Sequence, residues 1–167
     1  MNEDDIFDQT GGAYLCLMHP GRFEDDCQYW IDRLSALGPS VPDDLVAGLI
    51  AGASWRERLI GLYLAASRAP HAFVQPALES LSSPRGISLV PACAFLAVLT
   101  RKGVYRMTPE FGRQFDRDAF AGELGWAVDK ALHYAGLKEI DAAGKSPNRG
   151  QCFEDHAALY CRLLEAD

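Results

Sequence analysis

Hydrophobic and polar residues recur at helical spacing along most of this 167-residue chain. The clearest pattern covers residues 54–68, where one helix face carries Trp55, Leu59, Leu62, Tyr63 and Ala66. Ser54 and Glu57 have the spacing of a capping box, in which the serine oxygen accepts from the N3 amide and the glutamate accepts from the cap amide. The pattern therefore predicts a complete helix that begins just after Ser54.

Further amphipathic segments predict helices at 23–37, 42–51, 71–81, 87–100, 108–117, 120–136 and 151–164. Glycine and proline residues mark most of their ends. Residues 87–100 are apolar on all sides, so we expect this helix to be central and enclosed by the others. Pro76 is expected to shift or kink the helix that contains it.

Three segments lack a helical pattern. Residues 1–10 are acidic, and we expect them to form a frayed tail. Residues 11–21 contain a short apolar stretch that ends in a His-Pro-Gly turn signal, which fits either a short strand or an extended arm. Residues 137–150 are the longest polar stretch, which predicts an exposed loop.

No segment shows the sustained period-two alternation of a strand, so the sequence predicts an all-α fold. Short connections between successive helices imply antiparallel neighbours. We expect one domain over residues 1–167, with an acidic tail and extended arm at 1–22 and about seven helices at 23–167. Trp55 and Tyr63 repeat the spacing of Trp126 and Tyr134, which favours stacked, HEAT-like helical hairpins.

The charge balance changes the expected partner. The chain has 23 acidic and 16 basic residues, a formal net charge of −7. This balance argues against nucleic acid as the main partner, because phosphate binding requires a basic surface. An acidic surface suits one basic protein partner, although it also keeps a protein soluble.

The cysteine content and the apolar runs indicate the compartment. Five cysteines occur without CxxC spacing, and we interpret them as reduced thiols of a cytoplasmic protein. The acidic first residues do not resemble a secretory signal. The apolar run 87–99 has thirteen residues, too few to cross a bilayer of about 30 Å, so we expect no membrane association.

Three residue pairs have spacings that suit metal ligands on one helix face: Cys16 with His19, Asp129 with His133, and Cys152 with His156. Two such pairs would complete a tetrahedral zinc site, but structural zinc sites show clearer clustering. No nucleophile elbow, phosphate loop, zinc-protease or dinucleotide motif is present. We therefore expect no cofactor and no catalysis. The alternative is a small metal-binding protein or enzyme that uses Cys152 and His156.

Acidic residues in the first turns of two successive helices are the main candidates for partner binding: Glu24, Asp25, Asp26, Asp43 and Asp44. Such residues also stabilise the positive end of a helix. Adjacent helix starts would place these five carboxylates on one edge, where they would attract a basic partner.

The 104–118 region mixes both charges, and its Asp116 and Asp118 join the candidates. Trp126 lies on the opposite side of its helix from Leu124 and Ala131. It is therefore either buried against another helical pair or exposed as an aromatic anchor, and we include it among the candidates.

The sequence from 42 to 136 resembles a bacterial domain-of-unknown-function family with a HEAT-like helical core. The residues that carry this resemblance are Asp43-Asp44-Leu45, the W-R-x-R-L string at 55–59, the apolar segment 92–96, and Trp126-Ala127-Val128. The resemblance implies a helical, repeat-like fold and an immunity-type protein that neutralises a toxin by occluding its site. An adaptor in a larger assembly is the alternative.

Overall fold

The computed structural model describes residues 2–22, 24–139 and 147–165, without the side chains at 3, 4, 22, 24–26 and 147–149. Its α-helices are α1 (Glu3–Thr10), α2 (Ala13–Leu17), α3 (Glu24–Leu37), α4 (Asp43–Ala51), α5 (Trp55–Ala66), α6 (Val74–Ser82), α7 (Leu89–Arg101), α8 (Ala119–Tyr134) and α9 (Pro147–Leu163). Its 3-10 helices are η1 (Pro20–Arg22), η2 (Gly38–Ser40), η3 (Pro70–Phe73), η4 (Gly86–Ser88) and η5 (Phe111–Gln114). These residues contain no strand, which confirms the all-α class.

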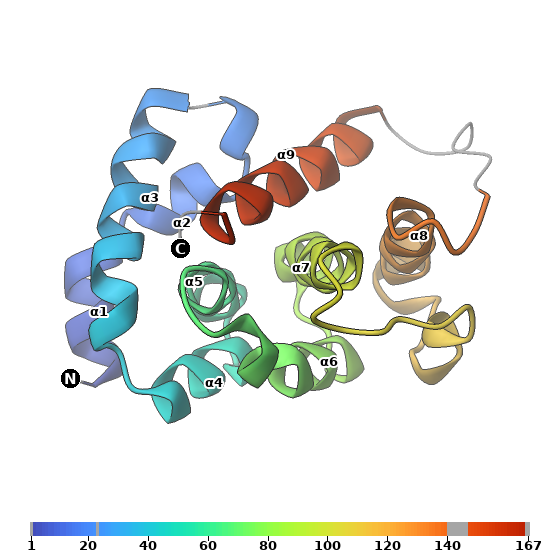
Figure 1. Ribbon diagram of the computed structural model, residues 1–167, viewed down its shortest axis with the longest axis horizontal. Helices are drawn as coiled ribbons and strands as arrows, with labels where there is room; N and C mark the ends of the chain where they lie inside the picture. Colours follow the sequence, from blue (N-terminus) through green and yellow to red (C-terminus); the bar gives the residue numbers. More distant parts are fainter. Residues whose placement is uncertain (1, 23, 140–146, 166–167) are drawn as a thin grey trace.

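Two central helices, α5 and α7, are surrounded by the others (Figure 1). Every residue from 58 to 66 and from 89 to 99 is buried. Helices α4 and α6 lie along one side, α9 crosses the opposite side, α8 covers α7, and α1–α3 form a separate layer beyond α5 (Figure 1). The predicted central position of the 87–100 helix is confirmed. The HEAT-like stacking stays a prediction.

The capping box at the start of α5 is also confirmed. The Ser54 oxygen accepts from the Arg56 amide at 3.2 Å, and the Ser54 amide donates to the Glu57 carboxylate at 3.1 Å. Two such bonds satisfy amides that the first helical turn leaves without partners. The beginning of this central helix is therefore fixed by its own sequence.

The N-terminal prediction was wrong, because residues 3–17 fold into α1 and α2 and pack on the core. Asn2 caps α1, accepting from the Asp5 amide at 2.9 Å. Ile6, Ala13 and Leu17 are fully buried. At the start of α5, the ring centroids of Tyr14 and Trp55 are 5.5 Å apart, which joins α2 to the core. The segment is neither a frayed tail nor an extended arm.

Several boundaries differ from the predicted ones. Nine α-helices are described: α3–α9 agree in number with the seven expected at 23–167, and α1 and α2 are additional. The helix expected at 108–117 is reduced to the 3-10 turn η5. Pro76 produces no internal kink, since α6 begins at Val74 and places the proline in the first turn, where its missing amide costs least. Helix α9 begins at Pro147, inside the predicted loop; residues 140–146 of that loop lie outside the described residues.

The entry into α8 contains three successive left-handed residues. Phe120 has φ 55° and ψ 50°, Ala121 has φ 55° and ψ 40°, and Gly122 has φ 78°. Left-handed backbone costs a residue with a β-carbon roughly 1–2 kcal/mol, whereas glycine adopts it freely. Phe120 and Ala121 therefore hold a strained turn in which the Phe120 ring remains 48% exposed.

Replacing Ala121 with glycine is expected to raise the free energy of unfolding by about 0.5–1 kcal/mol, because the strain at this position is removed. Urea unfolding followed by circular dichroism measures the change. Ala158→Gly is the matched control: Ala158 is exposed inside α9, where the same substitution should cost about 1 kcal/mol. Equal losses in the two variants would contradict the strain at Ala121.

Candidate functional site

The net negative charge of the protein is concentrated at one end of the sequence. Residues 1–32 contain eight acidic side chains and one arginine, which equals the formal net charge of −7 of the whole chain. Residues 33–167 contain 15 acidic and 15 basic side chains and are neutral. The acidic part corresponds to α1, α2, η1 and the first half of α3, the layer beyond α5 in Figure 1.

Part of this layer forms a surface that we call the acidic face, made by the exposed side chains of Asp5, Asp8, Tyr29 and Asp32 on α1 and α3. The exposed Arg33 adds one positive charge beside them, and its Nη1 donates to the Tyr29 hydroxyl at 3.5 Å. The two helices are tied together because Arg33 Nε donates to the Gln9 carbonyl at 2.7 Å. The acidic face therefore has a fixed backbone.

Tyr29 is the largest exposed aromatic of the acidic face. Its side chain is 57% exposed, and its ring packs edge-on against Trp30 with centroids 5.1 Å apart. Exposed tyrosine on a rigid helix is a common anchor in protein interfaces, because it supplies a large contact area at low entropic cost. The acidic face thus combines a charged field with an aromatic contact.

The acidic residues that the sequence predicted to share one edge do not do so. Helix α3 is 14 residues long, about 20 Å, and it separates its own start at Glu24 from the start of α4 at Asp43 (Figure 1). The side chains of Glu24, Asp25 and Asp26 lie outside the described residues. Asp44 is exposed.

Asp43 has a structural partner inside the chain. It is in an ion pair with Arg68, which also donates to the carbonyls of Gly38 and Val41. Arg68 therefore holds the turn between α3 and α4 against the end of α5, and much of the Asp43 charge is neutralised by this contact.

The remaining predicted residues lie near α8, far from the acidic face (Figure 1). Asp116 and Asp118 are both exposed, and the Asp116 carboxylate accepts from the Asp118 amide at 3.1 Å. Trp126 is half-buried and packs against the core. It is therefore neither fully buried between helices nor fully exposed as an aromatic anchor, the two alternatives that the sequence left open. A hollow of about 470 Å³ lies among residues 105–114 in the same region.

The Cys/His pairs do not assemble into a metal site in the part of the chain that the structure describes, where no three His, Cys, Asp or Glu side chains form a group that could hold a metal ion. The pairs at 16/19 and 152/156 do lie in the same region, since the Cys152 sulfur is 3.7 Å from the Met18 carbonyl. Asp129 is instead in ion pairs with Arg117 at 2.7 Å and Lys138 at 2.9 Å.

His156 belongs to a buried polar cluster with Tyr63 and Tyr160. Its Nδ1 is 2.8 Å from the Tyr63 hydroxyl, while its Nε2 and the Tyr160 hydroxyl have no hydrogen-bond partner in the described residues. Burial lowers the pKa of His156 from 6.5 to about 3, with a further contribution from His19. Burial also raises the pKa values of Tyr63 and Tyr160 well above 10.

This environment argues against Cys152 and His156 as a nucleophile and base. His156 is fully buried, and its Nδ1 is engaged by Tyr63, so the imidazole cannot reach a substrate in solution. The arrangement suits a neutral histidine that joins α9 to α5.

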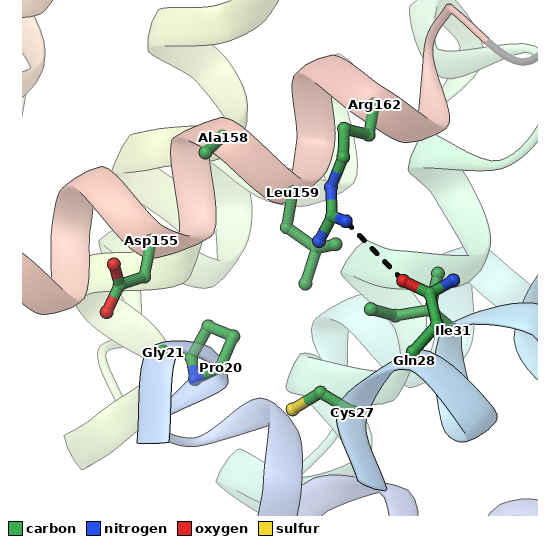
Figure 2. Close-up of a pocket in the computed structure, with 9 residues that line it drawn as sticks. All are labelled: Pro20, Gly21, Cys27, Gln28, Ile31, Asp155, Ala158, Leu159 and Arg162. Atoms are coloured by element: carbon green, nitrogen blue, oxygen red, sulfur yellow. Dashed lines mark hydrogen bonds between the residues drawn. The ribbon is translucent and has the colours of Figure 1, made fainter. Parts of the chain in front are cut away.

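A hollow of about 580 Å³ lies between η1, α3 and α9 (Figure 2). Residues of α9 form one wall: Asp155, Ala158, Leu159 and Arg162. The opposite side consists of Pro20, Gly21, Cys27, Gln28 and Ile31. Figure 2 shows Asp155 and Arg162 at the two ends of the α9 wall, with the smaller side chains between them.

No family model, no curated protein and no solved structure matches this chain. The resemblance to a bacterial helical family therefore stays a prediction. No described helix is both long and apolar enough to span a membrane.

Sequence reasoning missed both the acidic face and the hollow. The signal for the acidic face was present, because the first 32 residues carry the net charge of the whole chain. The hollow had no such signal, since Asp155 and Arg162 are isolated charges on an ordinary amphipathic helix.

Proposed function

We propose that this protein is a non-catalytic binding module that recognises one basic protein partner through the acidic face. The observation that carries the proposal is the position of the net charge: it belongs to one folded layer, and the exposed Tyr29 ring lies within that layer. A field of one sign attracts and orients an oppositely charged protein, while a central aromatic side chain slows its release.

A basic toxin domain is a partner of this kind, and the proposal includes the immunity role that the sequence resemblance implies. A nuclease toxin has a cleft that attracts phosphate, and an acidic protein surface can occupy such a cleft. An adaptor would use the same acidic face but would leave the activity of its partner unchanged. The activity of the captured partner, measured with and without one equivalent of this protein, separates the two roles.

Two variants of the full chain test the acidic face after capture of partners from a lysate of the source cells. With wild-type protein, one basic protein is expected at near-equal amounts. Asp8→Lys with Asp32→Lys should slow its association by about tenfold, and the effect should shrink at high salt. Tyr29→Ala should weaken binding by at least tenfold, mainly through faster dissociation. Stopped-flow and surface binding measurements give the two rates.

The matched control reverses two exposed carboxylates elsewhere, Glu79→Lys with Glu110→Lys. It makes the same change in net charge but leaves the acidic face intact. If the acidic-face variant and the control variant slow partner association equally, binding depends on the net charge of the protein and not on the acidic face. Binding unaffected by either acidic-face variant would overturn the proposal.

A further inference from the structure

The hollow between η1, α3 and α9 carries opposite charges at its two ends. Asp155 and Arg162 are seven residues apart on α9, which corresponds to about 10 Å along the helix axis. Both side chains border the same 580 Å³ space (Figure 2). A hollow of this kind has an anionic end, a cationic end and a middle between them.

Neither charge is in an ion pair within the described residues. Asp155 Oδ1 accepts from the side-chain amide Nε2 of Gln151 at 2.7 Å, and Arg162 Nη1 donates to the side-chain oxygen Oε1 of Gln28 at 3.4 Å. These two described partners are neutral amides, which orient the charged groups without neutralising them.

The middle of the hollow is kept open by small or apolar residues. Ala158 and Leu159 separate the two charges on α9, and Cys27 lies opposite. A β-carbon at Gly21 would lie 2.4 Å from Asp155 Oδ2, so glycine lets η1 approach the carboxylate. The space between the charges can accommodate an aliphatic chain.

We propose that this hollow binds a flexible zwitterion whose ammonium group pairs with Asp155 and whose carboxylate pairs with Arg162. A simple cation would be attracted by Asp155 and repelled by Arg162, and a simple anion would meet the reverse arrangement. Only a molecule with both charges satisfies both ends. This proposal does not depend on the acidic face or on its partner.

The spacing of the two residues sets the length of the zwitterion. If each ion pair spans about 3 Å, the charges of the bound molecule are about 4–7 Å apart. Each bond advances an extended chain by about 1.3 Å, so the ammonium and the carboxylate are joined by about three to five bonds in an extended chain, and by more in a bent one. The five bonds of 5-aminopentanoate meet this requirement in an extended chain. The six bonds of 6-aminohexanoate, or of a C-terminal lysine with its free carboxylate, meet it when the flexible chain is bent.

NMR titration of the isotope-labelled full chain tests the class and the length. We expect saturable amide shifts at Gly21, Gln28 and Ala158 with 5-aminopentanoate or 6-aminohexanoate. Glycine is too short, and hexylamine and hexanoate each lack one charge, so these three should bind at least tenfold more weakly. Equal binding of hexylamine or hexanoate, or no saturation by any amino acid at 100 mM, would overturn the proposal.

Variants of the two charged residues supply the second test. Asp155→Asn and Arg162→Gln should each weaken binding of 6-aminohexanoate at least fivefold. Glu154→Gln is the control, because it removes the neighbouring carboxylate of α9, which is in an ion pair with Lys130 and does not line the hollow. Unchanged affinity in both hollow variants, with their folding verified by circular dichroism, would refute the assignment.

Two peptides identify the source of the zwitterion. Acetyl-Ala-Ala-Lys with a free carboxylate and the same peptide with an amidated end differ only in the carboxylate. Tighter binding of the free-carboxylate peptide than of 6-aminohexanoate identifies a protein C-terminus. Binding of 6-aminohexanoate without binding of either peptide identifies a free ω-amino acid.

Discussion

Replacing Arg58 with methionine is expected to lower the free energy of unfolding by about 3–5 kcal/mol, a large part of the stability of a typical domain. The Arg58 guanidinium is only 3% exposed and donates to the carbonyls of Gly52, Ser80 and Ser83, each at 2.7 Å. Methionine has a similar length but no donor. Three carbonyls would each lose a hydrogen bond, and the one of Ser80 belongs to a buried residue.

The position of these carbonyls explains why the effect should be large. Gly52 follows the last residue of α4, whereas Ser80 and Ser83 lie at the end of α6. A cation at the end of α6 also interacts favourably with the negative end of that helix. Arg58 therefore joins two peripheral helices to the central α5, and its removal should loosen all three.

Urea unfolding of Arg58→Met beside Arg56→Met measures this contribution. Arg56 belongs to the same W-R-x-R-L string but is exposed, and its guanidinium carbon lies 4.8 Å from the Tyr14 ring centroid. Its substitution should cost under about 1 kcal/mol, because an exposed cation–π contact is weak. Arg58→Lys should recover only part of the loss, since one ammonium cannot reproduce the planar fork. Similar losses at positions 56 and 58 would contradict the special role of Arg58.

The structure gives the W-R-x-R-L string a folding role at each of its defined positions. Trp55 and Arg56 contact Tyr14 of α2, Arg58 binds the ends of α4 and α6, and Leu59 is fully buried. The most distinctive string in the sequence thus describes how α5 is held by its neighbours, and it carries no information about a partner.

A helix could be predicted from the sequence where its hydrophobic positions match the face, or faces, that it buries in the core. Helix α7 is buried on every side, so its apolar composition was sufficient. Helix α1 was missed because it has eight residues, and among its side chains from 5 to 10 two, Ile6 and Thr10, are fully buried. Two positions do not establish a period, and such a short helix depends on tertiary contacts.

The candidate site was harder to predict because it depends on helix directions. Adjacent helix starts in the sequence suggested one acidic edge, but α4 begins beyond the end of α3, so the length of α3 separates the two starts (Figure 1). The two predicted helix starts are therefore at two different places in the backbone. The acidic face requires α1 to fold against α3, a contact made by Arg33 across 24 positions of the chain.

The stability of the protein is expected to fall by about 2 kcal/mol between pH 6.5 and pH 5.0 because His156 is buried in its neutral form. Burial lowers its pKa in the folded protein from 6.5 to about 3. Between these values the unfolded chain binds one proton more than the folded chain. The free energy of unfolding therefore decreases by about 1.4 kcal/mol for each pH unit below 6.5.

The tyrosines beside His156 do not titrate between pH 6.5 and pH 5.0, so the loss of stability in this range is assigned to the histidine. Tyr63 and Tyr160 have pKa values raised well above 10 by burial, so both stay neutral in acid. The pKa of Asp129 is raised by burial, but the hydrogen bonds from Arg117 and Lys138 lower it by more, so its contribution disappears only at lower pH. The contributions of Asp129 and His156 to the free energy of unfolding are therefore lost in different pH ranges.

Urea unfolding of wild-type protein and of His156→Gln at pH 7.5, 6.5, 5.5 and 5.0 tests this assignment. Glutamine cannot be protonated in this range but still offers an acceptor to the Tyr63 hydroxyl. The variant should be less stable at pH 7.5, yet its stability should change little down to pH 5.0, so the two curves converge. A decrease of equal slope in both proteins would assign the acid sensitivity to other groups, whereas convergence would show that α9 is held to α5 by a histidine that must remain neutral.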